Sequence, residues 1–159
     1  ILELSIAYNE LKYSNSQIDF IERMNKIAKT KSFYGLLASL DLIRNKINNN
    51  QYNESYEDYL KLMKNKNIDN LYKTLIAIHG SYNLLEKISN DKIDKLLTYI
   101  DESLDSFTGY RLELLFLLSV NNGNINKTRS LYEQIIEDER ISFSIKERVK
   151  KINEFEKYN

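Results

Sequence analysis

Apolar residues recur along this chain at spacings of three and four, which is the period of an amphipathic α-helix. The pattern is clearest where a very apolar segment, residues 111–120, precedes an amphipathic segment, residues 125–137. Between them, Gly123 tolerates the left-handed conformation that ends many helices, and the side-chain oxygen of Asn124 can cap the next helix. The stretch therefore predicts a hairpin of two helices. The apolar face of its second helix consists of Ile125, Leu131, Tyr132, Ile135 and Ile136.

The same period divides the rest of the chain into helices joined by polar turns rich in Asn, Asp and Ser. Residues 1–13 and 18–28 predict two helices, separated by a break at Ser14-Asn15-Ser16. Ser32 and Ser106 are expected to cap the helices that follow them. The further helices are expected at 33–47, 52–63, 71–85, 93–104 and 145–155.

The first and third of the resulting hairpins resemble each other when they are aligned on their turns. The matched pairs are Leu42 with Leu115, Ser55 with Thr128, Tyr59 with Tyr132, Leu62 with Ile135 and Met63 with Ile136. A small residue lets two helices pack closely, and an aromatic residue fills the space against the neighbouring hairpin. The predicted fold class is therefore all-α, with antiparallel helical hairpins stacked as a right-handed solenoid like that of tetratricopeptide repeats.

A length of 159 residues suits one domain with a sizeable core, and no visible linker divides the chain. We therefore expect a single helical repeat domain over residues 1–159. Its parts are expected to be N-terminal helices at 1–31, three hairpins at 32–140 and a C-terminal capping helix at 141–159.

Composition argues against several classes of function. The 23 basic and 23 acidic residues balance without forming long blocks, so no nucleic-acid partner is expected. The chain has no cysteine, a single histidine, His79, and no glycine-rich phosphate loop, so common catalytic and metal sites lack necessary members. No run of 18 apolar residues predicts a membrane-spanning helix. The prediction is a non-enzymatic protein without cofactor or metal.

The twelve tyrosines have two explanations. Tyrosine commonly fills interfaces between helices with its hydroxyl at the rim, which is the explanation favoured for Tyr52, Tyr59, Tyr82 and Tyr132. Tyrosine is also enriched at interfaces between proteins. In a regular solenoid the first helix of each hairpin lines the concave side, where a peptide would bind. The residues expected to bind a protein there are Leu37, Arg44, Asn48, Tyr110, Glu113 and Asn121.

Two segments resemble a known family. The segment Phe33-Tyr34-Gly35-Leu36-Leu37-Ala38-Ser39-Leu40 is similar to the opening of the YfgM-type tetratricopeptide-repeat-like family. The last hairpin, with the segment Ser144-Ile145-Lys146-Glu147-Arg148-Val149, is similar to the closing part of that family. The resemblance covers the chain from about Ser16 to its end.

Members of this family are anchored in the bacterial inner membrane by one N-terminal helix and expose the repeat domain to the periplasm. They are ancillary subunits of the Sec translocon that associate with a periplasmic chaperone or prolyl isomerase. The resemblance thus implies an interaction scaffold at the periplasmic face of the inner membrane, with residues 1–31 leading from a removed anchor.

The residues leave two alternatives open, and they do not determine the partner or the oligomeric state. One is an enzyme, which would need a cleft with converging polar groups. The other is a module that associates with itself. A helix that is apolar all round is buried, either inside its own domain or against another molecule. The run at 112–120 could therefore belong to a structural module of the bacterial envelope that associates with a second copy of itself.

Overall fold

The computed structural model describes residues 2–12 and 17–156 of the chain. Over these ranges the backbone forms nine α-helices and one short 3₁₀ helix, with no strand. The prediction of an all-α protein is confirmed for this part of the chain. The predicted break at Ser14-Asn15-Ser16 lies outside the described residues.

The chain divides into two compact units, Ile1–Asn67 and Ile68–Asn159, where the sequence had predicted one domain. The division falls at a short exposed segment, residues 65–67, between two helices. This segment contains neither proline nor glycine, so its composition does not distinguish it from the polar turns elsewhere in the chain.

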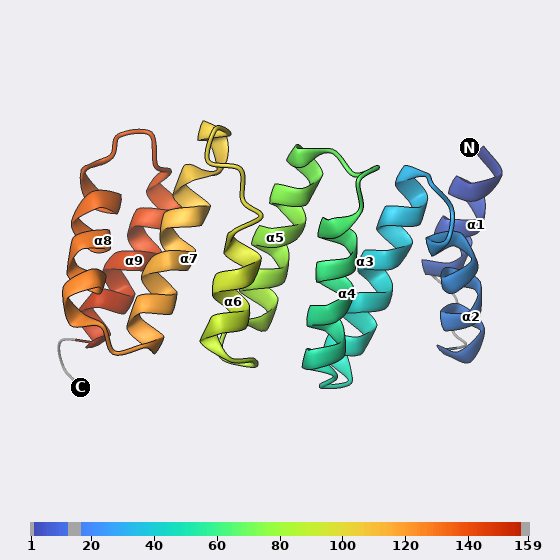
Figure 1. The fold of residues 1–159 in the computed structure, drawn as a ribbon, viewed down its shortest axis with the longest axis horizontal. Helices are drawn as coiled ribbons and strands as arrows, with labels where there is room; N and C mark the ends of the chain where they lie inside the picture. The colour runs from blue at the N-terminus through green and yellow to red at the C-terminus, as the bar shows by residue number, and fades with distance from the viewer. Residues whose placement is uncertain (1, 13–16, 157–159) are drawn as a thin grey trace. The chain divides into compact units, whose positions relative to one another are not determined.

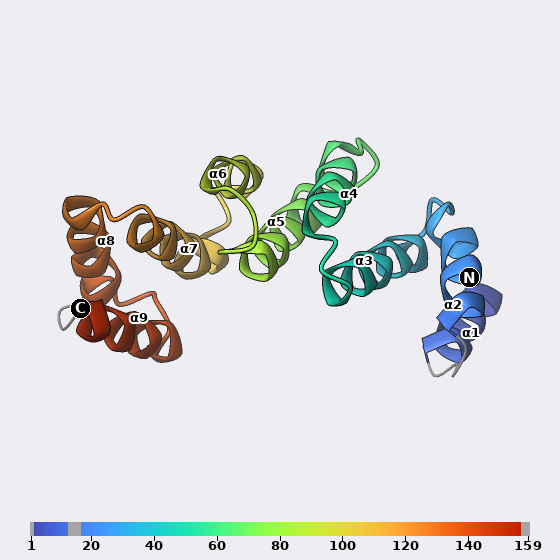
Figure 2. The same ribbon diagram turned by 90° about the horizontal axis from the view of Figure 1, so that it is seen from below.

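The first unit contains four helices, which Figures 1 and 2 show from two sides. They are α1 Leu2–Lys12, α2 Gln17–Ala28, α3 Phe33–Asn48 and α4 Tyr52–Lys64. The buried residues of its core cluster are Tyr8, Met24, Ile27 and Ala38. These residues come from α1, α2 and α3, so the cluster packs the first three helices against one another.

Local side-chain bonds fix the ends of α3 and α4. The Ser32 hydroxyl accepts a hydrogen bond from the Gly35 N–H at 3.1 Å, as predicted for an N-cap. Asn50 adopts a φ of 59°, in the left-handed region that asparagine tolerates better than most residues, and this lets the chain reverse into α4. Ser55 is fully buried, and its hydroxyl donates to the Gln51 carbonyl at 2.7 Å.

The second unit contains five α-helices and the 3₁₀ helix. They are α5 Asn70–Leu84, α6 Asn90–Leu97, η1 Asp105–Phe107, α7 Thr108–Asn121, α8 Ile125–Glu137 and α9 Phe143–Glu156. Two predictions are wrong here. The return helix expected to reach residue 104 ends at Leu97, and Ser106 lies inside η1 instead of capping α7. The α-helix ends there because the Tyr99 and Ile100 N–H groups donate to carbonyls three residues back, those of Leu96 and Leu97, instead of four. The Asp101 N–H then donates to the buried Thr74 hydroxyl of α5 at 3.0 Å.

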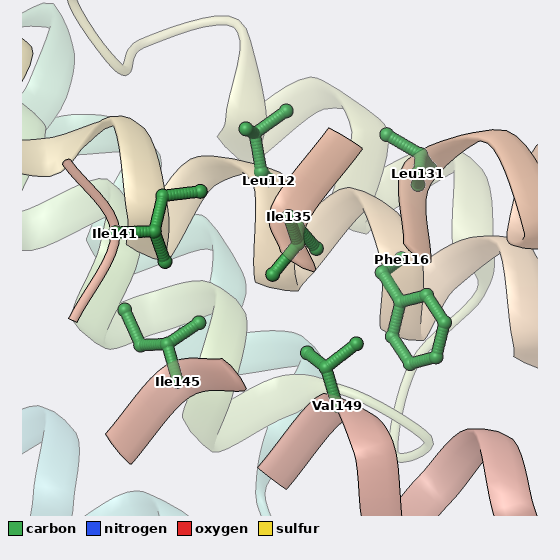
Figure 3. Packing of buried hydrophobic residues seen from close by; sticks show 7 residues of the cluster. All are labelled: Leu112, Phe116, Leu131, Ile135, Ile141, Ile145 and Val149. Atoms are coloured by element: carbon green, nitrogen blue, oxygen red, sulfur yellow. The ribbon is translucent and has the colours of Figure 1, made fainter. Parts of the chain in front are cut away.

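The apolar helix α7 is buried inside the second unit, where it packs against α5, α6, α8 and α9. The core cluster of this region consists of Leu112, Phe116, Leu131, Ile135, Ile141, Ile145 and Val149, and Figure 3 shows these side chains converging. Leu115, Leu117 and Val120 are partly buried against the same cluster. Packing within one chain therefore accounts for the apolar run that had suggested self-association.

The predicted turn after α7 is present. Gly123 has a φ of 63°, and the Asn124 side chain accepts from the Lys127 N–H at 3.1 Å. Ile125 was expected on the apolar face of α8 but is 75% exposed. It precedes Leu131 by six residues, which places it about 120° further round the helix.

Residues of α4 and α8 that the predicted repeat matches are buried to different extents. Tyr59 and Met63 are fully buried in α4, whereas the matched Tyr132 and Ile136 of α8 are only half-buried. Ile135, one position before Ile136, is the fully buried residue of α8. The two hairpins therefore share helices and turns without burying matched positions.

Candidate protein-binding cleft

A cleft of about 470 Å³ opens within the first unit, and we call it the α2–α4 cleft because three helices line it. Its apolar lining consists of Ile21, Ala28, Leu42, Ile43 and Leu62. Its polar lining consists of Asn25, Ser39, Asn45, Lys46, Gln51, Asp58 and Lys61. This volume lies within the roughly 300–1,000 Å³ that ligand-binding clefts of proteins commonly have.

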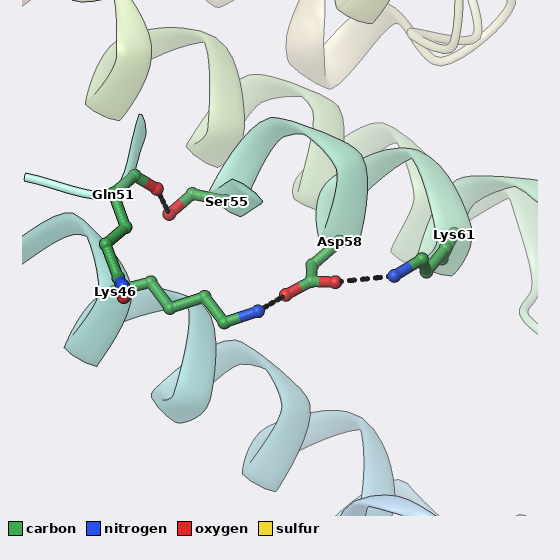
Figure 4. A network of polar contacts seen from close by, with 5 residues as sticks. All are labelled: Lys46, Gln51, Ser55, Asp58 and Lys61. Carbon is green, nitrogen blue, oxygen red and sulfur yellow. Dashed lines mark hydrogen bonds and ion pairs between the residues drawn. The ribbon is translucent and has the colours of Figure 1, made fainter. Parts of the chain in front are cut away.

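An ion-pair network crosses the cleft from α3 to α4. The Lys46 ammonium of α3 donates to Asp58 Oδ2, and the Lys61 ammonium donates to Asp58 Oδ1 at 3.0 Å (Figure 4). Lys61 is 75% exposed, whereas Asp58 is only 24% exposed. The carboxylate therefore lies deeper than the Lys61 ammonium, which stands at the rim.

The network favours the charged forms of Asp58 and Lys61. Partial burial favours the neutral form of Asp58, but the hydrogen bonds from Lys46 and Lys61 outweigh it and lower the pKa of the carboxyl group. The hydrogen bond to Asp58 raises the pKa of Lys61, with a smaller contribution from Glu57, which does not line the cleft. At neutral pH the lining carries two ammonium groups and one carboxylate.

The cleft lies on the opposite side of α3 from the predicted binding face. Ser39, Leu42 and Lys46 line it at spacings of three and four. The residues of this helix that were predicted to bind a protein are spaced by seven and four. At about 100° per residue, they lie on the face of α3 opposite the cleft lining. They are Leu37, Arg44 and Asn48. The predicted residues do not include the cleft lining, because the cleft is formed by the packing of α2 and α4 against α3. The spacing of apolar residues along one helix does not reveal which helices pack against it.

The predicted face of α3 is partly occupied by α1. Leu37 is half-buried against the core cluster of the first unit. The Tyr8 hydroxyl of α1 donates to Asp41, which also lies 3.7 Å from the exposed Arg44 guanidinium. Burial and this bond raise the pKa of Tyr8. Arg44 and Asn48 are exposed, but neither lines the α2–α4 cleft.

The other three predicted residues lie on α7 in the second unit. Tyr110 is 41% exposed and Asn121 is exposed. Glu113 is only 2% exposed, so the expectation that it faces solvent is wrong. Its carboxylate accepts from the Tyr82 hydroxyl of α5 at 2.6 Å and from two nitrogens of the Arg148 guanidinium of α9, both at 2.6 Å.

These contacts make Glu113 a structural carboxylate that holds three helices together. Burial and the bond to Glu113 raise the pKa of Tyr82, and the bond to Glu113 raises the pKa of Arg148. Tyr82 therefore stays protonated and Arg148 stays charged at neutral pH. The six predicted residues are divided between the two units, with three on α3 and three on α7.

Residues 2–12 and 17–156 contain neither a metal-ligand cluster nor a membrane-spanning helix. No group of three or more His, Cys, Asp or Glu side chains there is arranged to hold a metal ion. Over the same ranges, no helix combines the length and the apolar character that a membrane span requires.

Comparison with known proteins identifies no relative. No known protein family, curated protein or solved structure matches the chain. The resemblance to the YfgM-type family therefore remains a prediction from the quoted segments.

Proposed function

We propose that this protein is a non-enzymatic interaction scaffold that binds a segment of a partner protein in the α2–α4 cleft. The observation that carries the proposal is the composition of the cleft, which combines an apolar part with amide groups and charges. Binding sites of proteins commonly have this combination, because apolar contacts supply affinity while a few polar groups fix orientation.

The amide side chains favour a peptide as the bound molecule. Asn25, Asn45 and Gln51 line the cleft from α2, from α3 and from the turn before α4. Each side-chain amide has both donor and acceptor groups, which match the alternating N–H and C=O groups of an extended main chain. The apolar residues beside them can then take the side chains of the segment.

Selection of peptides from a displayed random library on the purified chain tests this proposal. We expect selected peptides to lose binding when Asn25→Trp places an indole ring in the cleft, because Asn25 is an exposed residue of its lining. Asn126→Trp is the matched control, since Asn126 is an exposed residue of α8 in the second unit. Peptides that bind equally well to both variants would show that the cleft is not the binding site.

A narrower proposal concerns the setting in which the scaffold works. We propose that its hairpins stack like tetratricopeptide repeats and that it serves as an accessory factor of the Sec translocon and a periplasmic chaperone at the inner membrane. The support is the resemblance of the segments around residues 33–40 and 144–149 to the YfgM-type family. Affinity capture from bacterial membranes that recovers neither translocon nor chaperone components would contradict this narrower proposal and leave peptide binding untouched.

A further inference from the structure

The α2–α4 cleft has more hydrogen-bond donors on its charged groups than it satisfies internally. Each ammonium group has three N–H donors, and Lys46 and Lys61 each direct one to Asp58. Both carboxylate oxygens of Asp58 are therefore engaged by the lysines of the same chain. The lining is left with one net positive charge and with ammonium donors that a ligand can use.

The apolar part of the lining is close to these donors. Leu62 follows Lys61 on α4, and Leu42 precedes Lys46 by one helical turn on α3. Ile21, an apolar residue of α2 that is 37% exposed, lines the same cleft. A ligand that combines a negative charge with an adjacent apolar group would therefore contact both parts at once.

We propose that the α2–α4 cleft binds an acidic segment of the partner protein. One Asp or Glu carboxylate of the segment pairs with Lys61 and Lys46, and a neighbouring apolar side chain packs on Leu42 and Leu62. The inference rests on the proposed function and specifies the kind of segment that the scaffold takes.

The charge of the cleft favours a carboxylate over a phosphate. Asp58 stays in the lining when the ligand binds, so the lining keeps one net positive charge. One carboxylate balances this charge, whereas a phosphate group, with about two negative charges, exceeds it beside Asp58. Nucleic-acid binding requires several cations along a surface, whereas two lysines and one carboxylate leave a single net charge here. The apolar residues between α2 and α4 also suit a peptide side chain better than a sugar-phosphate backbone.

Chemical-shift mapping on the full chain, labelled with ¹⁵N, tests the inference. The probes are two pools of end-blocked octapeptides, one of random Gly, Leu and Glu, and the other identical except that Gln replaces Glu. We expect the Glu pool to shift the amide signals of Asn25, Lys46 and Lys61 at lower concentration than the Gln pool.

Two lysine variants give a matched comparison. Lys61→Gln should weaken binding of the Glu pool roughly tenfold, as loss of one charge-assisted hydrogen bond does. Lys26→Gln should leave binding unchanged, because Lys26 is 73% exposed, is paired with Glu22 on its own helix and does not line the cleft. Lys61 is equally exposed, so both variants are expected to fold.

The outcomes separate the inference from the proposed function. Equal binding of the two pools at the cleft would overturn the preference for an acidic segment and leave peptide binding standing. If neither pool nor any displayed peptide shifts the cleft residues, both proposals fail. If inorganic phosphate or a single-stranded oligonucleotide shifts the same amides at lower concentration than the Glu pool, the ligand is a phosphate and the inference is wrong.

Discussion

The buried carboxylate of Glu113 is expected to stabilise the fold through the hydrogen bonds that it accepts. It accepts hydrogen bonds from Tyr82 and from two nitrogens of Arg148, so donors of the protein itself compensate its charge. Glu113→Ala should lower the free energy of unfolding by about 2–4 kcal/mol, because it leaves the Tyr82 hydroxyl and a guanidinium without their acceptor. Urea denaturation followed by circular dichroism measures this loss.

The expected loss of unfolding free energy in Glu113→Ala is at the lower end of the range for breaking a buried ion pair. The reason is that Arg148 is 49% exposed, so water can hydrate its guanidinium when Glu113 is removed. Glu133→Ala is the control, since Glu133 is an exposed residue of α8 and surface substitutions usually change stability by less than about 0.5 kcal/mol. Equal stability of the two variants would show that the network of Glu113 does not support the fold.

Asp138, at the end of α8, predicts a pH dependence in the acid range. Its carboxylate accepts from the Arg140 side chain, at 3.0 and 2.7 Å, and from the Arg140 N–H at 2.9 Å. These bonds lower its pKa from 3.8 to about 2. Because the folded value is the lower one, the bonds stabilise the protein fully above the unfolded pKa, and this contribution is lost as pH falls from about 4 to about 2.

Comparison of the melting temperatures of the wild type and Asp138→Asn across this range measures the effect. The wild type should melt higher at pH 5, and the difference should shrink as pH approaches 2. A difference that stays constant over the whole range would mean that the charge of Asp138 is not what stabilises this turn.

Among the elements, the junction of α2 and α3 depends on a glycine for a steric reason. A Cβ atom built on Gly35 would lie 2.3 Å from the Thr30 backbone oxygen and 3.2 Å from the Ile27 backbone oxygen. Alanine normally stabilises a helix by up to about 1 kcal/mol relative to glycine. At this position the clash is with backbone, which cannot move aside cheaply, so Gly35→Ala should instead cost about 1–3 kcal/mol.

Thermal unfolding of Gly35→Ala beside Gly109→Ala separates the clash from helix propensity. The Cβ of the second variant would meet the tip of the Ile145 side chain at 2.9 Å, and a side chain can shift more easily than backbone. We expect the larger fall in melting temperature for Gly35→Ala. A stabilised Gly35→Ala variant would show that the loop at Thr30 adapts freely.

The elements themselves were largely predictable because their signals are local. Ser32 and Asn124 cap helices through residues three positions away, and the apolar period of each helix is contained within it. The path of the chain after α6 was not predictable, since the Asp101 N–H bonds to the Thr74 hydroxyl, 27 residues away. The burial of Glu113 likewise depends on Arg148, 35 residues further along the chain.

At the scale of the whole molecule, the sequence predicted the all-α class of the fold but not the division of the chain into two compact units. Periodicity identifies helices without showing which faces pack together, so it could not reveal that the α2–α4 cleft lies opposite the face of α3 that carries Leu37. The division after Asn67 was missed for a related reason, because a boundary between units depends on where long-range contacts end. Both features follow from packing between helices.

The division into units predicts where a protease cuts first. Lys64 and Lys66 are exposed and lie at the boundary, where local opening disrupts few tertiary contacts. The exposed lysines of the α2–α3 loop, Lys29 and Lys31, flank Thr30, whose hydroxyl donates to the Ile27 carbonyl at 2.8 Å and lies 2.8 Å from the Ser32 hydroxyl. Brief digestion with dilute trypsin should therefore cut after Lys64 or Lys66 before it cuts this loop.

Mass spectrometry of the early products identifies the cut, because cleavage at the boundary yields one fragment that ends at Lys64 or Lys66 and a second that begins directly after it. The double variant Lys64→Gln, Lys66→Gln should lose these early fragments and should fold normally, since both side chains are exposed. If the first cut in the wild type instead follows Lys29 or Lys31, the α2–α3 loop opens more readily than the boundary. The hydrogen bonds around Thr30 would then contribute less to local stability than packing within the two units does.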